Sequence, residues 1–172
     1  MKKVLLACAA LMFAATACPV ETPTGTNWAA CPTAGAGQVQ VAVVTEGVPD
    51  ATHEVVCVVV PAGSNSIQAL NARAARLGTE APRTAFGGTF VCAIDGNPVA
   101  PECGDLPGDA TGWRSWNYSN GGAQWTASQV GAASHTVSQG DVDGWNFGTW
   151  NYTTTFPGNP THSPSFSVLT GS

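Results

Sequence analysis

The sequence predicts an α+β domain in which one helix packs across a small, strand-rich, disulfide-bonded sheet. The chain has 172 residues, of which 20 are glycine and 12 are proline, and this composition favours turns and short strands over long helices. One segment alone has the apolar spacing of an amphipathic helix, whereas several short segments have strand patterns. Only 10% of the residues are charged and the formal net charge is −5, so we expect no nucleic-acid partner.

The N-terminus predicts export. Residues 1–17 combine two lysines, a short apolar run and small residues before Cys18, which is the pattern of a signal peptide. The apolar run is too short to span a bilayer as a helix. Ala15-Thr16-Ala17-Cys18 resembles a bacterial lipoprotein box, so Cys18 is the predicted lipidation site, with cleavage without lipidation as the alternative. We expect an exported protein that is lipid-anchored to the bacterial cell envelope or secreted.

The segment after the signal predicts a tether. Residues 18–37 are rich in Pro, Thr, Gly and Ala, which is typical of a flexible link between a lipid anchor and a folded body. Trp28 and Cys31 suggest that the end of this tether docks on the body.

One cysteine lies in the predicted signal peptide and Cys18 carries the predicted lipid, so four cysteines remain. In an oxidising compartment an even number of cysteines is expected to form disulfide bonds. Cys92 with Cys103 is favoured because the proline-containing loop between them can close a short ring. Cys31 with Cys57 then follows by elimination. We predict no metal site, because the cysteines and histidines lack metal-ligand spacing.

The first half of the body predicts two strands and a helix. Residues 39–43 alternate as a half-buried strand does, and residues 54–60 are apolar at both parities, which predicts a strand covered on both faces. Ser64 is a suitable N-cap and Gly78 a suitable C-cap for a helix at 65–77.

A second strand-rich half follows the helix. Strands are predicted at 89–94, 113–118, 124–128 and 145–152, with turns at Asp95-Gly96-Asn97-Pro98 and Asn120-Gly121-Gly122. Residues 153–172 predict a Ser/Thr/Pro-rich tail that could dock on the body.

Aromatic side chains concentrate between residues 113 and 152, where five of the six tryptophans lie. A small sheet cannot bury them all, and flat rings in a weakly charged cleft suit planar apolar ligands or sugar rings. The alternative is that Trp113, Trp125 and Trp145 are simply the core. Arg114 and Asn117 would orient a neutral ligand. The predicted ligand-binding residues are Trp116, Tyr118, Trp125, Trp145, Phe147, Trp150, Arg114 and Asn117.

Catalytic and metal-binding patterns are weak. Gly140-Asp141-Val142-Asp143-Gly144 places two carboxylates in a predicted strand-entry turn, and a calcium site, the alternative, would lack the ligands of an EF-hand loop. His135 lies within the aromatic half and could face a ligand. Nucleophile elbows, phosphate-binding loops and Cys/His nucleophile patterns do not occur in the sequence, so we predict no enzymatic activity, no catalytic residues and no cofactor.

Several segments, taken in order and spacing, resemble the transcobalamin-like C-terminal domain family of exported proteins. The similar segments are Val-Pro-Ala-Gly-Ser-Asn-Ser-Ile-Gln-Ala-Leu at 60–70, Phe-Val-Cys-Ala-Ile-Asp-Gly-Asn-Pro at 90–98, Trp-Arg-Ser-Trp-Asn-Tyr at 113–118 and Gly-Asp-Val-Asp-Gly-Trp-Asn-Phe-Gly at 140–148. The last segment is especially similar to the actinobacterial branch. The resemblance runs from about residue 38 to residue 150, and we predict a ligand-binding domain at 38–152.

This resemblance implies a β-grasp-like fold, with the helix at 65–77 lying across a mixed sheet. It also implies capture of cobalamin or a related corrinoid outside the membrane, for a membrane transporter. Animal cobalamin carriers hold the ligand between this domain and a larger α-helical barrel, so a helical partner chain is also expected. The segment at 113–118 departs from the aromatic order of the actinobacterial branch and contains Arg114, so the ligand face is expected to differ.

We therefore expect an exported, lipid-anchored, non-enzymatic module that binds a small ligand. One alternative is a surface structural or adhesive domain whose tryptophans form its core or contact a protein partner. The other is a carbohydrate-binding module, for which coplanar tryptophans are expected.

Overall fold

The structure is a computed structural model that describes residues 28–48, 55–88, 90–99, 113–150 and 158–171. For residues 28–29, 88, 113–117 and 149–150 it describes the backbone alone. The predicted signal peptide, the predicted lipidation site Cys18 and the predicted disulfide partner Cys103 lie outside the described residues.

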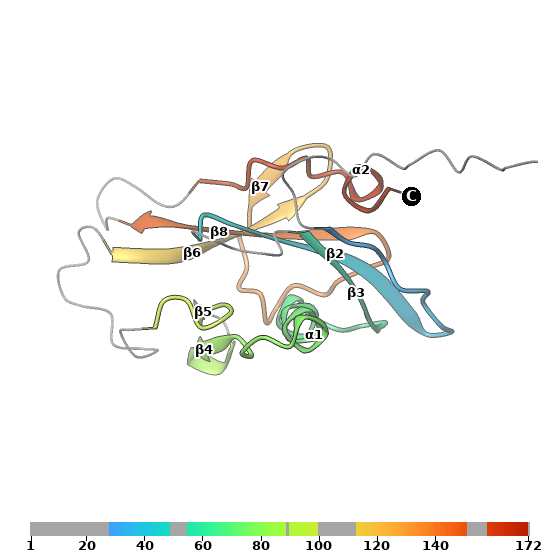
Figure 1. The fold of residues 1–172 in the computed structure, drawn as a ribbon, viewed down its shortest axis with the longest axis horizontal. Helices are drawn as coiled ribbons and strands as arrows, with labels where there is room; N and C mark the ends of the chain where they lie inside the picture. Colours follow the sequence, from blue (N-terminus) through green and yellow to red (C-terminus); the bar gives the residue numbers. More distant parts are fainter. Residues whose placement is uncertain (1–27, 49–54, 89, 100–112, 151–157, 172) are drawn as a thin grey trace, which may run out of the picture.

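A six-stranded mixed sheet forms the centre of the molecule (Figure 1). Its strands, in spatial order, are β1 (Trp28–Ala29), β3 (Val55–Pro61), β2 (Gln38–Glu46), β8 (Asp141–Trp150), β6 (Trp113–Gly121) and β7 (Trp125–Ala127). β2 is antiparallel to β3 and parallel to β8, while β6 is antiparallel to both β8 and β7. β4 (Arg83–Ala85) and β5 (Phe90–Ala93) form a separate antiparallel pair, joined by a short 3-10 helix at Phe86–Gly88. The predicted α+β class is confirmed.

The helix α1 (Ser66–Leu77) forms where the apolar spacing predicts it, but its N-cap is Asn65 rather than Ser64. The Asn65 side chain accepts a hydrogen bond from the Gln68 backbone, and the Gln68 side chain accepts one from the Asn65 backbone. This reciprocal capping box stabilises a start one residue later than predicted. Gly78 ends the helix in the left-handed conformation, at φ 70°, as predicted.

Both faces of the sheet are covered, because strand residues alternate between them. Val41 and Val43 of β2 contribute to a core on the side of α1 and β5, together with Trp145 of β8. Ala42 and Val44 contribute to a second core on the opposite side, beneath the short helix α2 (Phe166–Thr170). In Figure 1 the two helices lie on opposite sides of the sheet. Residues 158–171, predicted as part of a tail that could dock, therefore form one of the protein's layers.

The segment at 140–144 is not the predicted turn. β8 begins at Asp141, because its backbone pairs in parallel with β2 from Val41 onward. Only Gly140, at φ 83°, has a turn conformation. The long-range pairing with β2 thus extends the predicted strand toward the N-terminus and places Asp143 inside the sheet.

The N-terminal segment is tied to the sheet at β3. β1 pairs with β3, and Cys31 forms the predicted disulfide bond with Cys57. Arg76 at the end of α1 donates hydrogen bonds to the Ala30 carbonyl, at 2.7 Å, and to the Cys57 carbonyl. Cys92 is also disulfide-bonded.

Candidate functional site

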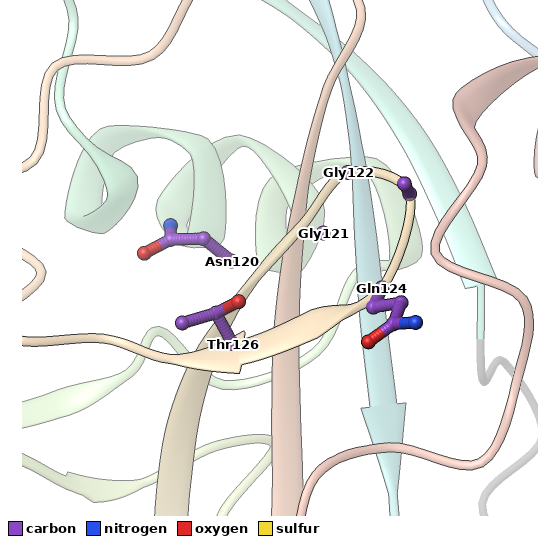
Figure 2. Close-up of a pocket in the computed structure, with 6 residues that line it drawn as sticks. Asn120, Gly121, Gly122, Gln124 and Thr126 are labelled. Carbon is purple, nitrogen blue, oxygen red and sulfur yellow. The ribbon is translucent and has the colours of Figure 1, made fainter.

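A hollow of about 500 Å³ opens beside the turn between β6 and β7 (Figure 2). We call it the hairpin hollow. Its lining consists of Asn120, Gly121, Gly122, Ala123, Gln124 and Thr126. These residues carry no charge, and their polar groups are two amides, a hydroxyl and the backbone. Such a surface can hydrogen-bond a neutral polar ligand but offers no ion pair.

The pairing of β6 with β7 builds this hollow. Asn120 lies directly opposite Thr126, so their side chains share one face of the hairpin, as Figure 2 shows. Gly121 and Gly122 lead into the turn, and Gln124 follows it. An alanine Cβ at Gly121 would lie 2.9 Å from the Val142 Cβ, so glycine permits the close approach of β6 to β8.

A chain of hydrogen bonds fixes Asn120 from behind. Its Nδ2 donates to the Tyr118 hydroxyl at 2.9 Å, and that hydroxyl donates to Asp143 Oδ1 at 3.0 Å. We call these three side chains the relay. Asp143 is fully buried in β8, whereas Asn120 reaches the hollow. The relay therefore connects the hollow with a buried carboxylate.

His135 and Ser66 complete a polar cluster around the relay. The His135 Nδ1 atom lies 2.9 Å from both the Ser66 Oγ and the Tyr118 hydroxyl oxygen. The other ring nitrogen, Nε2, lies 3.5 Å from Asn120 Nδ2. The His135 carbonyl accepts from the Ser66 backbone at 3.1 Å, which docks the loop before β8 on the N-terminus of α1.

Burial shapes the electrostatics of this cluster. Removal from water raises the pKa of Asp143 to about 6, although hydrogen bonds from Ser66 and Tyr118 and the charge of His135 oppose the shift. The nearby Asp141 carboxylate adds to it. Burial, and then the charge of Asp143, raises the pKa of the Tyr118 hydroxyl well above its usual range, so this phenol stays protonated. Asp143 therefore titrates within the range of environmental pH.

The cluster is not arranged for nucleophilic catalysis. In a Ser-His-Asp triad the serine and the carboxylate contact opposite nitrogens of the imidazole. Here Ser66 Oγ at 2.9 Å and Asp143 Oδ1 at 3.8 Å both face Nδ1. Ser66 is also 0% exposed, which bars a substrate from its hydroxyl. We interpret the cluster as a structural network with a titratable centre.

Four of the predicted ligand-binding aromatics are packed against the sheet. Trp145 is 2% exposed and stacks on Tyr118 with ring centroids 4.6 Å apart, while Phe147 packs in the same core. Trp125 lies on the opposite face, where its Nε1 donates to the His162 carbonyl at 2.7 Å. Tyr118 belongs to the relay. These contacts account for the rings within the fold itself.

The other four predicted residues are placed by their backbone alone. Trp116 pairs with Phe147, Asn117 with Asn146 and Arg114 with Thr149. Trp150 ends β8 opposite Trp113. All four therefore belong to the β6–β8 strand pair, which extends away from the hairpin.

The two carboxylates of β8 have different hydrogen-bond partners. Asp141 accepts a hydrogen bond from the Ser138 backbone at 2.7 Å, and Asp143 faces Tyr118. Among the described residues, no group of three His, Cys, Asp or Glu side chains is arranged to hold a metal ion.

Sequence reasoning identified Asn120 only as a turn residue, and it did not identify Thr126 or Gln124. The polar character of the turn was visible in the sequence, but its link to Asp143 depends on β8 lying beside β6. His135, interpreted from the sequence as a surface histidine that could face a ligand, contacts Ser66 and Tyr118.

When the sequence is compared with models of protein families and with curated proteins, it matches none of them. Within the described part of the chain, no helix has both the length and the apolarity needed to cross a bilayer.

Proposed function

We propose that this protein is an exported, lipid-anchored, non-enzymatic module that binds a small neutral ligand at the hairpin hollow. The observation that carries the proposal is the uncharged polar lining of that hollow. A ligand with hydroxyl or amide groups would find donors and acceptors there without the cost of removing an ion from water.

Preorganisation supports this site. Within the described residues, Asn120 uses Nδ2 for Tyr118 and leaves Oδ1 without a hydrogen bond, so this oxygen is available as a fixed acceptor. A side chain that is already held loses little conformational entropy when a ligand binds. Tyr118 and Asp143 would thus raise the affinity by holding Asn120, without contacting the ligand themselves.

A corrinoid is the ligand class to test first. Its rim carries several neutral amide groups, which match the lining chemically, and the resemblance to transcobalamin-like domains implies the same class. A corrinoid is larger than the hollow, so the proposal includes Arg114 and Trp116, which share a face of β6 with Asn120, as further contacts. Delivery to a membrane transporter or to a helical partner chain completes the proposal.

Two further observations support parts of this proposal. The disulfide bonds at Cys57 and Cys92 are typical of proteins that fold in an oxidising compartment, which favours export. We propose a β-grasp-like fold, which is supported by α1 lying across a mixed sheet in which β2 and β8 are parallel and central. The hairpin partners β3 and β6–β7 flank this pair on either side.

Calorimetric titration tests the proposal. The chain without its predicted signal peptide, called the exported chain, is titrated in its disulfide-bonded form with cobalamin and with cobinamide. Saturable heat is expected from the wild type and from Ala127→Phe, an exposed position outside the hollow. Ala123→Phe, which fills the hollow, should abolish the heat while leaving the fold intact by circular dichroism.

Heat that persists undiminished in Ala123→Phe would overturn the assignment of the site. No heat from either corrinoid would remove corrinoid capture and favour the surface structural or adhesive role.

A further inference from the structure

We propose that the hairpin hollow is a proton-controlled binding site, in which the relay turns the Asn120 amide and so exchanges the acceptor offered to a ligand for a donor. This inference deepens the proposed function and rests on it for its biological meaning. Its physical core concerns the ligand-free protein, and it stands on the geometry of Asn120, Tyr118, His135 and Asp143.

At neutral pH each hydrogen bond of the relay is donated toward Asp143. Ionised Asp143 can only accept, so the Tyr118 hydroxyl donates to it at 3.0 Å. The Tyr118 oxygen then accepts from Asn120 Nδ2 at 2.9 Å. Asn120 Oδ1 is left to the hollow, which presents an acceptor.

His135 supports the same direction. Asn120 Nδ2 lies 3.5 Å from His135 Nε2, so the neutral ring favours the tautomer in which Nε2 carries no hydrogen. Nδ1–H then donates toward Ser66 Oγ or the Tyr118 oxygen, each 2.9 Å away. These hydrogen bonds are mutually compatible in this state, and among the described residues the Asp143 Oδ2 atom has no hydrogen-bond partner.

Protonation reverses the relay. A protonated Asp143 becomes a donor to the Tyr118 oxygen, which releases the Tyr118 hydroxyl hydrogen to Asn120 Oδ1 or to the Ser66 Oγ atom 2.6 Å away. A protonated His135 carries hydrogen on Nε2, which opposes the Asn120 NH₂ group and attracts its oxygen. Both protons favour the same outcome, a half-turn of the Asn120 amide that puts Oδ1 inside and Nδ2 in the hollow.

The surroundings place this change in a useful pH range. Burial raises the pKa of Asp143 to about 6, and the His135 Nδ1 atom lies 3.8 Å from its Oδ1 atom. The groups that face the pair are the Tyr118 hydroxyl from β6, the Ser66 hydroxyl at the N-terminus of α1, and the Asp141 carboxylate from β8. Asp141 favours protonation of Asp143, whereas Ser66 and Tyr118 favour its ionised form.

A ligand that donates a hydrogen bond to the hollow would therefore be held near neutral pH and released in acid. Loss of one such bond corresponds to about a fivefold to tenfold weaker affinity.

Nuclear magnetic resonance of the ligand-free, oxidised exported chain tests the switch. The side-chain amide of Asn120 and the carboxyl carbon of Asp143 are followed from pH 8 to pH 4.5. We expect the Asn120 amide signals to shift with the same midpoint as Asp143. The Gln124 amide, which lines the same hollow without contacting the relay, is the internal control and should show no such step.

Two variants separate the relay from a general pH effect. Tyr118→Phe keeps the ring that stacks on Trp145 but removes the hydroxyl, so the Asn120 step that follows Asp143 should be lost. Asp143→Asn has no proton to lose, so its Asn120 signals should lack the step that follows Asp143 in the wild type between pH 8 and pH 4.5.

An Asn120 amide that does not follow Asp143, or a step that survives Tyr118→Phe unchanged, would overturn the switch. Because this readout needs no ligand, a failed corrinoid titration would contradict the proposed function while leaving the switch in place.

Discussion

Gly144 in β8 shows how a single residue can determine whether the second face of the sheet packs. An alanine Cβ at this position would lie 2.5 Å from a carbon of the Trp125 ring and 2.8 Å from the Pro160 ring. Both neighbours are held, Trp125 through its hydrogen bond to His162 and Pro160 by burial. The absence of a side chain at Gly144 therefore lets the Trp125 ring and Pro160 pack against β8.

We predict that Gly144→Ala destabilises the protein by about 1–3 kcal/mol, because the ring and the proline must both shift. Gly122→Ala is the matched control, since its Cβ would meet nothing within 4 Å. The free energies of unfolding are measured by urea denaturation. Equal stability of the two variants would contradict the packing described for Trp125.

The raised pKa of Asp143 should make the free energy of unfolding depend on pH. Because its pKa is raised in the folded state, folding favours its protonated form, and this stabilisation is lost as the pH rises through about 6. Asp143→Asn cannot lose a proton. The unfolding free energy of the variant, relative to wild type, should therefore increase between pH 5 and pH 7.5. A difference that stays constant over this range would show that Asp143 does not titrate in the folded protein.

At the scale of elements, the Glu46 carboxylate makes several of the contacts that hold the C-terminal segment. Glu46, at the end of β2, accepts from the Thr161 backbone at 2.7 Å, the Thr161 hydroxyl at 2.8 Å and the His162 backbone at 2.9 Å. It also contacts the His162 ring. Burial alone would raise the pKa of Glu46, but these hydrogen bonds together lower it. Its stabilising effect is therefore present above pH 4.5, the ordinary value, and is lost in stronger acid.

Glu46→Gln should loosen this segment, because the neutral amide replaces one acceptor oxygen with a donor. We expect a loss of about 1–3 kcal/mol in stability at pH 7. Hydrogen exchange should become faster at residues 161–171, and the loss of stability below pH 4.5 should become shallower than in the wild type. Glu80→Gln, at an exposed position, is the control. Unchanged exchange at 161–171 would contradict the role of Glu46.

Elements with strong local patterns could be predicted from the sequence. The helix at 66–77 and the strand at 55–61 formed where apolar spacing placed them. The sequence does not predict α2, because five residues are too few to show a helical period. The packing of Leu169 in the second core stabilises this short helix. The start of β8 was misplaced because pairing with β2, distant in sequence, determines it.

The candidate site could be predicted less well than the fold. Aromatic density indicated the correct half of the chain, but Trp145 and Phe147 were needed for the core. The relay joins β6 to β8, and the loop that carries His135 joins both to α1. Local patterns do not encode such contacts, because they arise only when the sheet assembles.

At the scale of the whole molecule, the Cys31–Cys57 disulfide joins the predicted tether to the centre of the fold. The two cysteines are 26 residues apart, and closing a loop of this size stabilises a folded chain by about 3 kcal/mol. We predict that the double variant Cys31→Ser and Cys57→Ser loses about 2–4 kcal/mol in urea denaturation. A double variant as stable as wild type would show that β1 and Arg76 hold this segment without the disulfide.

Ligand binding at the hairpin hollow predicts where the chemical shifts of the protein change when a corrinoid is added. Amide chemical shifts of the isotope-labelled, oxidised exported chain are recorded with and without cobinamide at pH 7.5. We expect the largest changes at residues 120–126, with smaller ones along β6 toward Trp116. Changes confined to the opposite face, around α2 and residues 158–171, or no changes at all, would contradict the account.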